Sequence, residues 1–359
     1  MSSLRRSRPG PIVLGALTLT IAASVAGPPV AVGQLLMNGA GATFPYPIYS
    51  KWFDEYAKVD PGARFNYQSI GSGGGIRQIT ARTVDFGATD GPMTDEQLKA
   101  APAELLHIPT VLGAVVTTYN LPGSPKLRFV PDVLADVFLG KITKWNDPRI
   151  TGANPGISLP DQPIVVVHRS DGSGTTYIWV DYLSKVSREW EQKVGRGTSV
   201  NWPVGLGGKG NEGVAGQVKN TPGALGYVEL AYAVQNKLPT ALVRNAAGRF
   251  VEPTIESTTA AAAGAAKDMP GDFRVSLTNA PGDDAYPIAS FTWLLVYKSQ
   301  PDETKGRTLV KFLWWAAHDG QKYPKDLLYA PLPPQVVKQI ESRLKEITFQ
   351  GRPFLAAAQ

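Results

Sequence analysis

Apolar residues recur along the chain in two spacings that alternate from one segment to the next. Short runs rich in β-branched and aromatic residues predict strands at 64–70, 84–88, 111–120, 164–167, 224–228 and 290–297. Apolar residues three or four positions apart predict helices at 48–58, 76–82, 95–101, 132–139, 175–185, 307–317 and 334–347, and the alanine-rich stretch 260–266 is typical of another. Thr94 and Gln97 have the spacing of a capping box before the helix at 95–101. Because strands alternate with helices, we expect an α/β fold.

The amino terminus has a different pattern. A short basic start, an uncharged apolar run at 12–25 and the small residues Ser24 and Ala26 predict a cleaved secretory signal peptide at 1–26, with an uncleaved anchor as the alternative. The run is shorter than the roughly 20 apolar residues of a membrane-spanning helix. No later stretch is long enough either, so we expect a soluble, exported protein. Arg5-Arg6 leaves the twin-arginine export route open beside the general one.

The amino-acid composition excludes several kinds of site and function. The 359 residues suggest about two domains. The chain has no cysteine, which excludes disulfides, thiol catalysis, zinc–thiolate sites and a lipid-modified N-terminal cysteine, and its three histidines are scattered. Export without cysteine favours a periplasm. Three of the six excess positive charges lie within 1–26, and the small remainder does not indicate nucleic-acid binding.

Four loops combine glycine with Ser, Thr or Asp in front of a predicted helix, at 39–44, 71–75, 88–91 and 169–175. In all but the 88–91 loop, glycine allows the backbone to approach a ligand, and the first helical turn offers free N–H groups. We interpret these three as candidate anion-binding loops. A single loop of this kind is more often an ordinary helix cap, so the prediction depends on their recurrence.

Two charged residues extend this chemistry. Arg169 precedes the last loop, where its guanidinium can bind two oxygens of a tetrahedral anion. The alternative is a surface ion pair with Asp171, and both interpretations hold if Asp171 orients Arg169. Asp90 is a carboxylate among anion-binding loops, which makes sense only for an anion that carries a proton. Otherwise Asp90 is a turn or cap residue.

Seven segments, in chain order, closely resemble the periplasmic phosphate-binding proteins of phosphate-specific ABC transporters. They are 38–47 (NGAGATFPYP), 66–79 (NYQSIGSGGGIRQI), 84–92 (VDFGATDGP), 140–147 (GKITKWND), 168–177 (HRSDGSGTTY), 202–213 (WPVGLGGKGNEG) and 222–231 (PGALGYVELA). The resemblance spans nearly the whole chain after the predicted signal peptide.

At the matching motif positions the resemblance implies a phosphate site without catalytic or metal-binding residues. Its phosphate-binding residues would be Thr43, Phe44, Ser72, Asp90, Arg169, Ser173, Gly174 and Thr175, with Asp171 supporting Arg169. Two positions depart from the family pattern. Gly73 follows Ser72 where the family often has a second serine, and His168 stands where a second basic residue often occurs. Neither departure removes an assigned contact.

The resemblance also implies a two-lobed periplasmic-binding-protein fold, type II-like, with the ligand in the interlobe cleft. Lobe I would comprise 35–118 and 288–359, and lobe II 119–287, with two crossings near 111–120 and 287–297. Two crossing strands would allow the lobes to rotate around the ligand. The implied protein is a monomeric periplasmic receptor, without a cofactor, that binds inorganic phosphate with high affinity and delivers it to membrane permease subunits.

Other functions stay open at this point. A receptor of the same fold could bind arsenate, which is protonated like phosphate, or sulfate or molybdate. Asp90 disfavours sulfate, which lacks a proton. A secreted phosphatase would need a metal cluster or an activated nucleophile, which the histidine and cysteine counts disfavour. The remaining alternative is an adhesion or sensing protein that binds phosphate incidentally.

Overall fold

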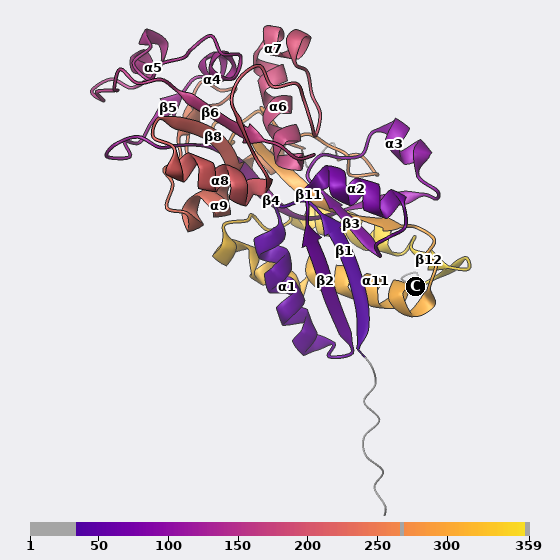
Figure 1. Ribbon diagram of the computed structural model, residues 1–359. Coiled ribbons are helices and arrows are strands. Elements are labelled where there is room, and N and C mark those ends of the chain that lie inside the picture. Colours follow the sequence, from indigo (N-terminus) through magenta and orange to yellow (C-terminus); the bar gives the residue numbers. More distant parts are fainter. Residues whose placement is uncertain (1–33, 266–268, 356–359) are drawn as a thin grey trace, which may run out of the picture. The chain divides into compact units, whose positions relative to one another are not determined.

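The computed structural model describes residues 34–265 and 269–355, so the signal peptide predicted at 1–26 lies outside the described residues. Helices and strands alternate along the chain (Figure 1), which confirms the predicted α/β class. The strands are β1 (Leu35–Gly41), β2 (Ala63–Ser69), β3 (Phe86–Thr89), β4 (Leu105–Tyr119), β5 (Arg128–Phe129), β6 (Val165–Arg169), β7 (Leu206–Gly208), β8 (Ala224–Glu229), β9 (Leu242–Arg244), β10 (Phe250–Val251), β11 (Ala289–Tyr297), β12 (Thr348–Phe349) and β13 (Arg352–Pro353). The α-helices are α1 (Tyr46–Val59), α2 (Ser72–Thr80), α3 (Asp95–Ala100), α4 (Pro131–Phe138), α5 (Pro148–Ala153), α6 (Gly174–Val186), α7 (Arg188–Lys193), α8 (Gly210–Asn220), α9 (Leu230–Gln235), α10 (Ile255–Ala265), α11 (Glu303–Ala317) and α12 (Pro334–Leu344).

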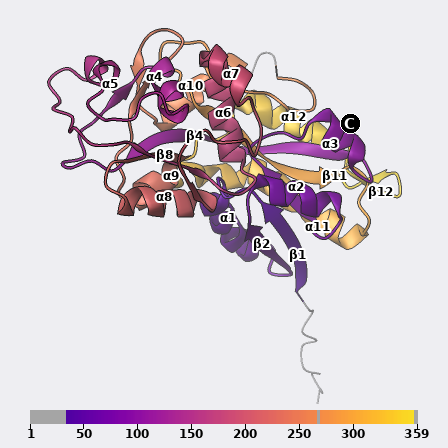
Figure 2. The ribbon, with the colours of Figure 1, turned by 45° about the horizontal axis from the view of Figure 1, so that its top comes forward.

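One long strand joins two halves of the main sheet. The eight strands have the order β2-β1-β3-β11-β4-β8-β6-β7. The first part of β4, from Leu105 to Ala114, pairs antiparallel with β11, and its last residues, Val115 to Tyr119, pair antiparallel with β8. We call β2, β1, β3 and β11 the first sheet half, and β8, β6 and β7 the second sheet half (Figure 2).

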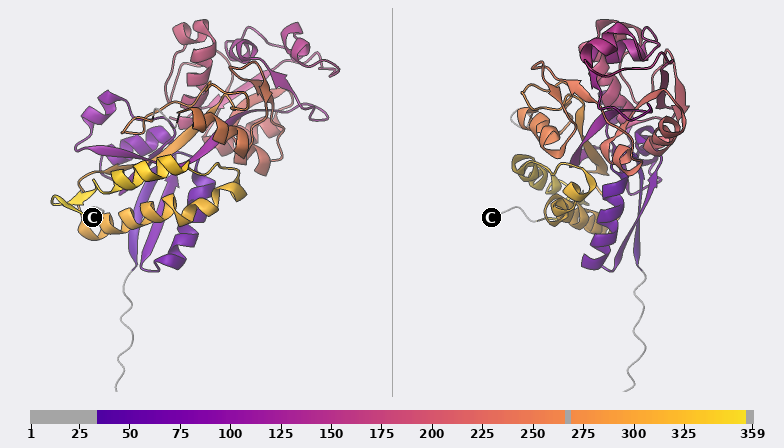
Figure 3. Two further views of the ribbon diagram at one scale, coloured as in Figure 1. Left: turned by 180° about the vertical axis from the view of Figure 1, so that it is seen from behind. Right: turned by 90° about the vertical axis from the view of Figure 1, so that its left-hand side faces the viewer.

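The first sheet half is covered on both faces. Phe53 of α1 lies 5.2 Å from the Phe65 ring of β2 and 5.5 Å from the Phe312 ring of α11, so α1 and α11 pack on one face. Ile79 of α2 belongs to a separate core cluster that includes Leu295 of β11, and it lies on the other face. Figure 3 shows α11 and α12 side by side across the back of these strands.

The second sheet half is built in the same way. The Trp179 ring of α6 stacks on the Tyr227 ring of β8 at 5.0 Å, and Phe138 of α4 lies 5.1 Å from Trp179. Val218 of α8 lies against Gly226, on the opposite face of β8. This layering places the loops that follow β6 and β8 beside those that follow β1 and β3.

The predicted elements exist, with differences at their ends. The capping box of Thr94 and Gln97 is present at α3. The prediction for β4 started six residues too late. Pro109 lies inside this strand, where a register shift in the pairing with β11 accommodates a residue that lacks an N–H group. In the part of the chain that the structure describes, no helix is long and apolar enough to cross a membrane.

Glycine accounts for three further differences. Helix α2 begins at Ser72 rather than at 76, because it includes three glycines that weaken the sequence signal for a helix. Strand β1 and helix α8 were not predicted, and both are rich in glycine. Helices α10 and α11 begin five and four residues earlier than predicted, respectively, through polar first turns.

Candidate functional site

The first glycine loop joins β1 to α1 and contains Thr43 and Phe44, both buried. The hydroxyl of Thr43 accepts hydrogen bonds from the side-chain amide of Asn211, at 2.8 Å, and from the backbone N–H of Asn211, at 3.2 Å. The Asn211 amide also donates to the Thr175 hydroxyl at 3.1 Å. Asn211 therefore joins a loop of the first sheet half to a loop of the second.

The second glycine loop brings Ser72 to the start of α2. Gly71, just before it, has a φ of +85°, a conformation that favours glycine. The Ser72 hydroxyl is fully buried and accepts a hydrogen bond from the Asp90 N–H at 3.2 Å. Because the hydroxyl accepts this bond, its hydrogen is free to be donated to a ligand.

Asp90 follows β3 and is only 1% exposed. Its Oδ1 accepts a hydrogen bond from the Thr292 hydroxyl of β11 at 2.8 Å. Its Oδ2 is also buried and has no hydrogen-bond partner among the described residues. Burial raises the pKa of Asp90 to about 7, although the hydrogen bond from Thr292 and the charge of Arg169 oppose the increase. Such an oxygen needs a hydrogen from a partner or a proton of its own.

Arg169 ends β6 and is 3% exposed. Its Nε donates to Oδ1 of Asp171 at 2.8 Å, and its Nη2 donates to Oδ2 at 2.5 Å. Burial would raise the pKa of Asp171, but the hydrogen bonds and charge of Arg169 outweigh it and lower that pKa. Asp171 thus fixes one edge of the guanidinium, while Nη1 contacts the Thr175 hydroxyl at 3.4 Å. The other edge keeps N–H groups for an anion.

The fourth loop starts α6. Ser173 caps this helix by accepting the N–H of Thr176 at 3.0 Å, and Gly174 is its first residue. A Cβ at Gly174 would lie 2.5 Å from the Ser72 hydroxyl oxygen and 2.6 Å from the Asp90 nitrogen. The two loops therefore meet at a distance that only glycine permits.

The structure brings all eight sequence-predicted site residues together. Contacts link Ser72 to Asp90, Gly174 to both, Thr43 to Thr175 through Asn211, and Thr175 to Arg169. Phe44 and Ser173 adjoin members of this network. Asp171 occupies the supporting position predicted for it.

His168 contacts the site residues only through the backbone of Arg169. Its ring stacks on Trp202 at 4.6 Å, and its Nδ1 lies 3.0 Å from the Arg169 carbonyl. Burial lowers the pKa of His168, so the ring adds no positive charge near neutral pH. Among residues 34–265 and 269–355, no group of three or more His, Cys, Asp or Glu residues could hold a metal ion.

Several residues of the site were missed from the sequence. They are Asn211, Glu229, Tyr232, Thr292 and Tyr329, all buried around the predicted loops. Tyr232 donates to the Thr43 carbonyl at 2.6 Å, and Tyr329 donates to the Phe44 carbonyl at 2.6 Å. Asn211 and Glu229 lie in the segments 202–213 and 222–231, which carry part of the family resemblance. Thr292 is a polar residue inside an apolar strand. Tyr329 follows a short helical turn and has no local signal.

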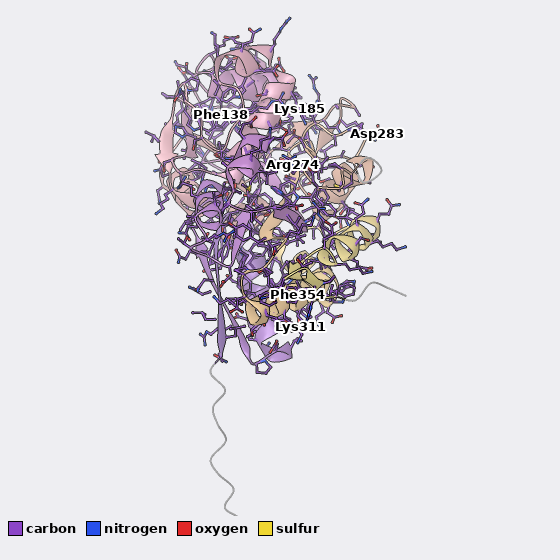
Figure 4. All side chains as sticks on the ribbon, turned by 90° about the vertical axis from the view of Figure 1, so that its right-hand side faces the viewer. Phe138, Lys185, Arg274, Asp283, Lys311 and Phe354 are labelled. Carbon is purple, nitrogen blue, oxygen red and sulfur yellow. The ribbon has the colours of Figure 1, made fainter. Side chains whose placement is uncertain are left out.

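A further contact supports the Asp90 loop from outside the site. Arg274 donates to the Met93 carbonyl at 3.0 Å and pairs with Asp95 at 2.7 Å, and the Met93 N–H donates to His107 at 3.0 Å. In Figure 4, Arg274 lies between the part of the molecule that carries Lys185 and the part that carries Phe354. The backbone of Met93, three residues after Asp90, is thus held at both its N–H and its carbonyl.

Comparison with known proteins defines first the class and then the family. A family model described as a PBP superfamily domain matches residues 24–319. The Phosphate-binding protein PstS of Xylella fastidiosa (strain 9a5c) is 51% identical over 310 residues, which are 85% of this chain and 84% of that protein. PstS of Pasteurella multocida (strain Pm70) is 50% identical over 313 residues, 86% of this chain and 90% of that protein. The chain therefore belongs to the PstS family of phosphate-binding proteins within the PBP superfamily.

Solved structures agree on the fold at much lower identity. A high affinity periplasmic phosphate-binding protein, PfluDING, bound with phosphate at pH 8.5, has a TM-score of 0.68 and 21% identity, and the match covers 86% of this chain and 93% of that one. A human phosphate binding apolipoprotein has a TM-score of 0.70 and 19% identity, over 85% and 93% of the two chains. The predicted two-lobed α/β fold is confirmed.

Proposed function

We propose that this chain is a periplasmic receptor that binds inorganic phosphate and delivers it to the membrane permease subunits of an ABC transporter. Membership of the PstS family supports the ligand and the transport role. The relatives are named as binding proteins, and we assign no catalytic residue here. In this proposal the predicted export signal at 1–26 directs the chain to the periplasm, where it acts as a monomer.

The phosphate lies between two lobes in this proposal. Lobe I comprises 35–118 and 288–359, and lobe II comprises 119–287. The two crossings fall in β4 and just before β11, which pair with each other at the centre of the sheet. The site residues divide evenly between these parts, and a ligand held by both would stabilise their closure.

Seven of the eight residues act as donors to phosphate. The hydroxyls of Thr43, Ser72, Ser173 and Thr175, the backbone N–H groups of Phe44 and Gly174, and the free edge of Arg169 provide them. Hydrogen bonds to a charged group contribute about 1.5–3 kcal/mol each. A few such bonds, after the costs of association, give a binding free energy of about −8 kcal/mol or lower, which is micromolar affinity or better.

The observation that carries the proposal is the buried Oδ2 of Asp90 without a partner. Phosphate near neutral pH keeps at least one proton, and this oxygen is an acceptor for it. Sulfate has the same shape but no proton, so its oxygens would face an ionised carboxylate. A site built for a hydrogen bond rejects an analogue that lacks the donor by roughly 10⁴–10⁵.

Calorimetric titration of the phosphate-stripped protein with phosphate, arsenate and sulfate tests this function. We expect tight binding of phosphate, binding of arsenate because it carries the same proton, and clearly weaker binding of sulfate at pH 8. Tighter binding of sulfate than of phosphate would contradict the proposal. Hydrolysis of p-nitrophenyl phosphate, with or without zinc, would instead support the phosphatase alternative.

A further inference from the structure

Glu229 is a buried acid beside the site, and it is not one of the proposed phosphate-binding residues. It ends β8, beside Val115 of β4, and its exposed fraction is 0%. Its Oε2 accepts the N–H of Ala231 at 2.9 Å, which caps helix α9. Its Oε1 is buried without a hydrogen-bond partner, and no cation pairs with this carboxyl in the described part of the chain.

The distances around the Tyr329 hydroxyl point to a protonated Glu229. The Tyr329 oxygen lies 2.6 Å from the Phe44 carbonyl oxygen and 3.2 Å from Oε2 of Glu229. A phenol has one hydrogen, and a carbonyl has none. If Tyr329 donates to Phe44, the contact with Glu229 is a hydrogen bond only when the carboxyl donates. A proton on Oε2 completes the chain from Glu229 to Tyr329 to Phe44.

Glu229 also acts on the adjacent peptide through helix α9. This helix carries Tyr232, whose hydroxyl donates to the Thr43 carbonyl at 2.6 Å. In a trans peptide the C=O and N–H groups point in opposite directions. The hydrogen bond on the Thr43 carbonyl therefore directs the Phe44 N–H away from Tyr232. Glu229 caps the helix that carries one of these tyrosines and contacts the other (Figure 2 shows β8 leading into α9).

The charges around Glu229 oppose its ionisation. Burial is the main reason that its pKa lies well above the ordinary value, and the charge of Asp90 adds to the shift. Two tyrosines, Tyr232 and Tyr329, face it as neutral groups, and Arg169 faces Tyr232 and Asp90 rather than Glu229. An ionised Glu229 would place a second uncompensated negative charge near the bound anion.

We propose that Glu229 is a positioning residue that works in its uncharged form, donating its hydrogen to Tyr329 so that the Thr43–Phe44 loop keeps its N–H aimed at phosphate. The inference rests on the proposed phosphate function. Its chemistry is that of a carboxylic acid which remains a hydrogen-bond donor at neutral pH because it is fully buried and forms no ion pair with the described residues.

Carbon-13 NMR of the phosphate-bound wild-type protein, labelled at the glutamate side-chain carboxyls, tests the protonation directly. At pH 8 we expect one glutamate resonance at the shift of a protonated acid, and we expect it to be absent in E229Q. Carboxylate shifts for every glutamate would overturn the inference. Failure of wild type to bind phosphate would instead refute the proposed function, so the two failures are distinguishable.

Binding measurements test the positioning role. We expect E229Q, which stays neutral and similar in size, to bind phosphate within about threefold of wild type, whereas E229A and Y329F each bind about tenfold more weakly. The double variant E229A/Y329F should lose little more than either single variant, because the two residues act in one chain. Fully additive losses, or equal losses in E229Q and E229A, would contradict the role. Y329F keeps this test available if E229A does not fold.

Discussion

The two sides of the site differ in what they leave unsatisfied. The first sheet half supplies Asp90, a buried carboxylate with one oxygen that lacks a partner. The second supplies Arg169, a buried cation whose charge is already paired with Asp171. Neither side is strongly charged overall, so attraction comes mainly from oriented N–H and O–H donors. In the proposed function, discrimination between anions comes from the single acceptor on the first side.

The largest loss of phosphate affinity is expected from a variant that prevents the two loops from meeting. In G174A the new Cβ would overlap the Ser72 hydroxyl and the Asp90 backbone, so the loops could not meet. Loss of two charged hydrogen bonds, about 1.5–3 kcal/mol each, weakens phosphate binding roughly a thousandfold. The control is G216A in helix α8, where a Cβ meets nothing within 4 Å. Unchanged affinity in G174A by calorimetry would show that the loops do not meet in the bound state.

The second prediction concerns a variant that lacks the positive charge of Arg169. R169M loses the charged donor and leaves the half-buried Asp171 without its cation. We expect phosphate affinity to fall about a hundredfold, because the bond to the anion is lost and an unpaired acid remains. In R169M/D171N the acid is removed as well, and part of the loss should be recovered. A double variant no better than R169M would mean that Asp171 only supports the arginine.

The third prediction uses pH to separate the two anions. Because burial raises the pKa of Asp90 to about 7, this group is protonated below that pH and can then donate to sulfate. Sulfate affinity should be level below about pH 7 and fall roughly tenfold per pH unit above it. Phosphate carries its own proton and should show no such fall. Sulfate affinity independent of pH from 6 to 9, measured by competition calorimetry, would contradict this.

The smallest effect is expected outside the site. R274M loses the contacts with the Met93 carbonyl and with Asp95, which support the Asp90 loop from behind. Asp95 is largely exposed, and exposed ion pairs contribute about 0–1 kcal/mol. We expect phosphate dissociation, followed by stopped flow, to be about two- to fivefold faster. A hundredfold acceleration would mean that this contact, rather than the ligand, holds the two sides together.

Local patterns were sufficient for the loops but not for what surrounds them. Thr43, Ser72, Asp90 and Arg169 stand in short motifs, and the family resemblance of those motifs predicted which residues would lie together. The partners that orient them come from distant segments. Thr292 is 202 residues from Asp90, and no local spacing encodes such a contact.

The fold shows the same division. Strong apolar periodicity predicted α1, α6 and β11, whereas the glycine-rich β1 and α8 lack such a pattern and are stabilised by tertiary packing. In β1, for example, a Cβ at Gly39 would lie 2.1 Å from the Phe86 ring, so only glycine leaves room for this aromatic ring. That requirement becomes visible only when β3 is placed beside β1.

The most direct measurement is the ratio of the sulfate to the phosphate dissociation constant at pH 8, in wild type and in D90N. An asparagine has the same size as Asp90, carries no charge, and can donate a hydrogen to either anion. We predict that D90N lowers the ratio about tenfold or more at pH 8, because that pH lies about one unit above the pKa of about 7 and an ionised Asp90 must take up a proton before it can donate to sulfate. Equal ratios in the two proteins would contradict the assignment of anion discrimination to the unpartnered oxygen of Asp90.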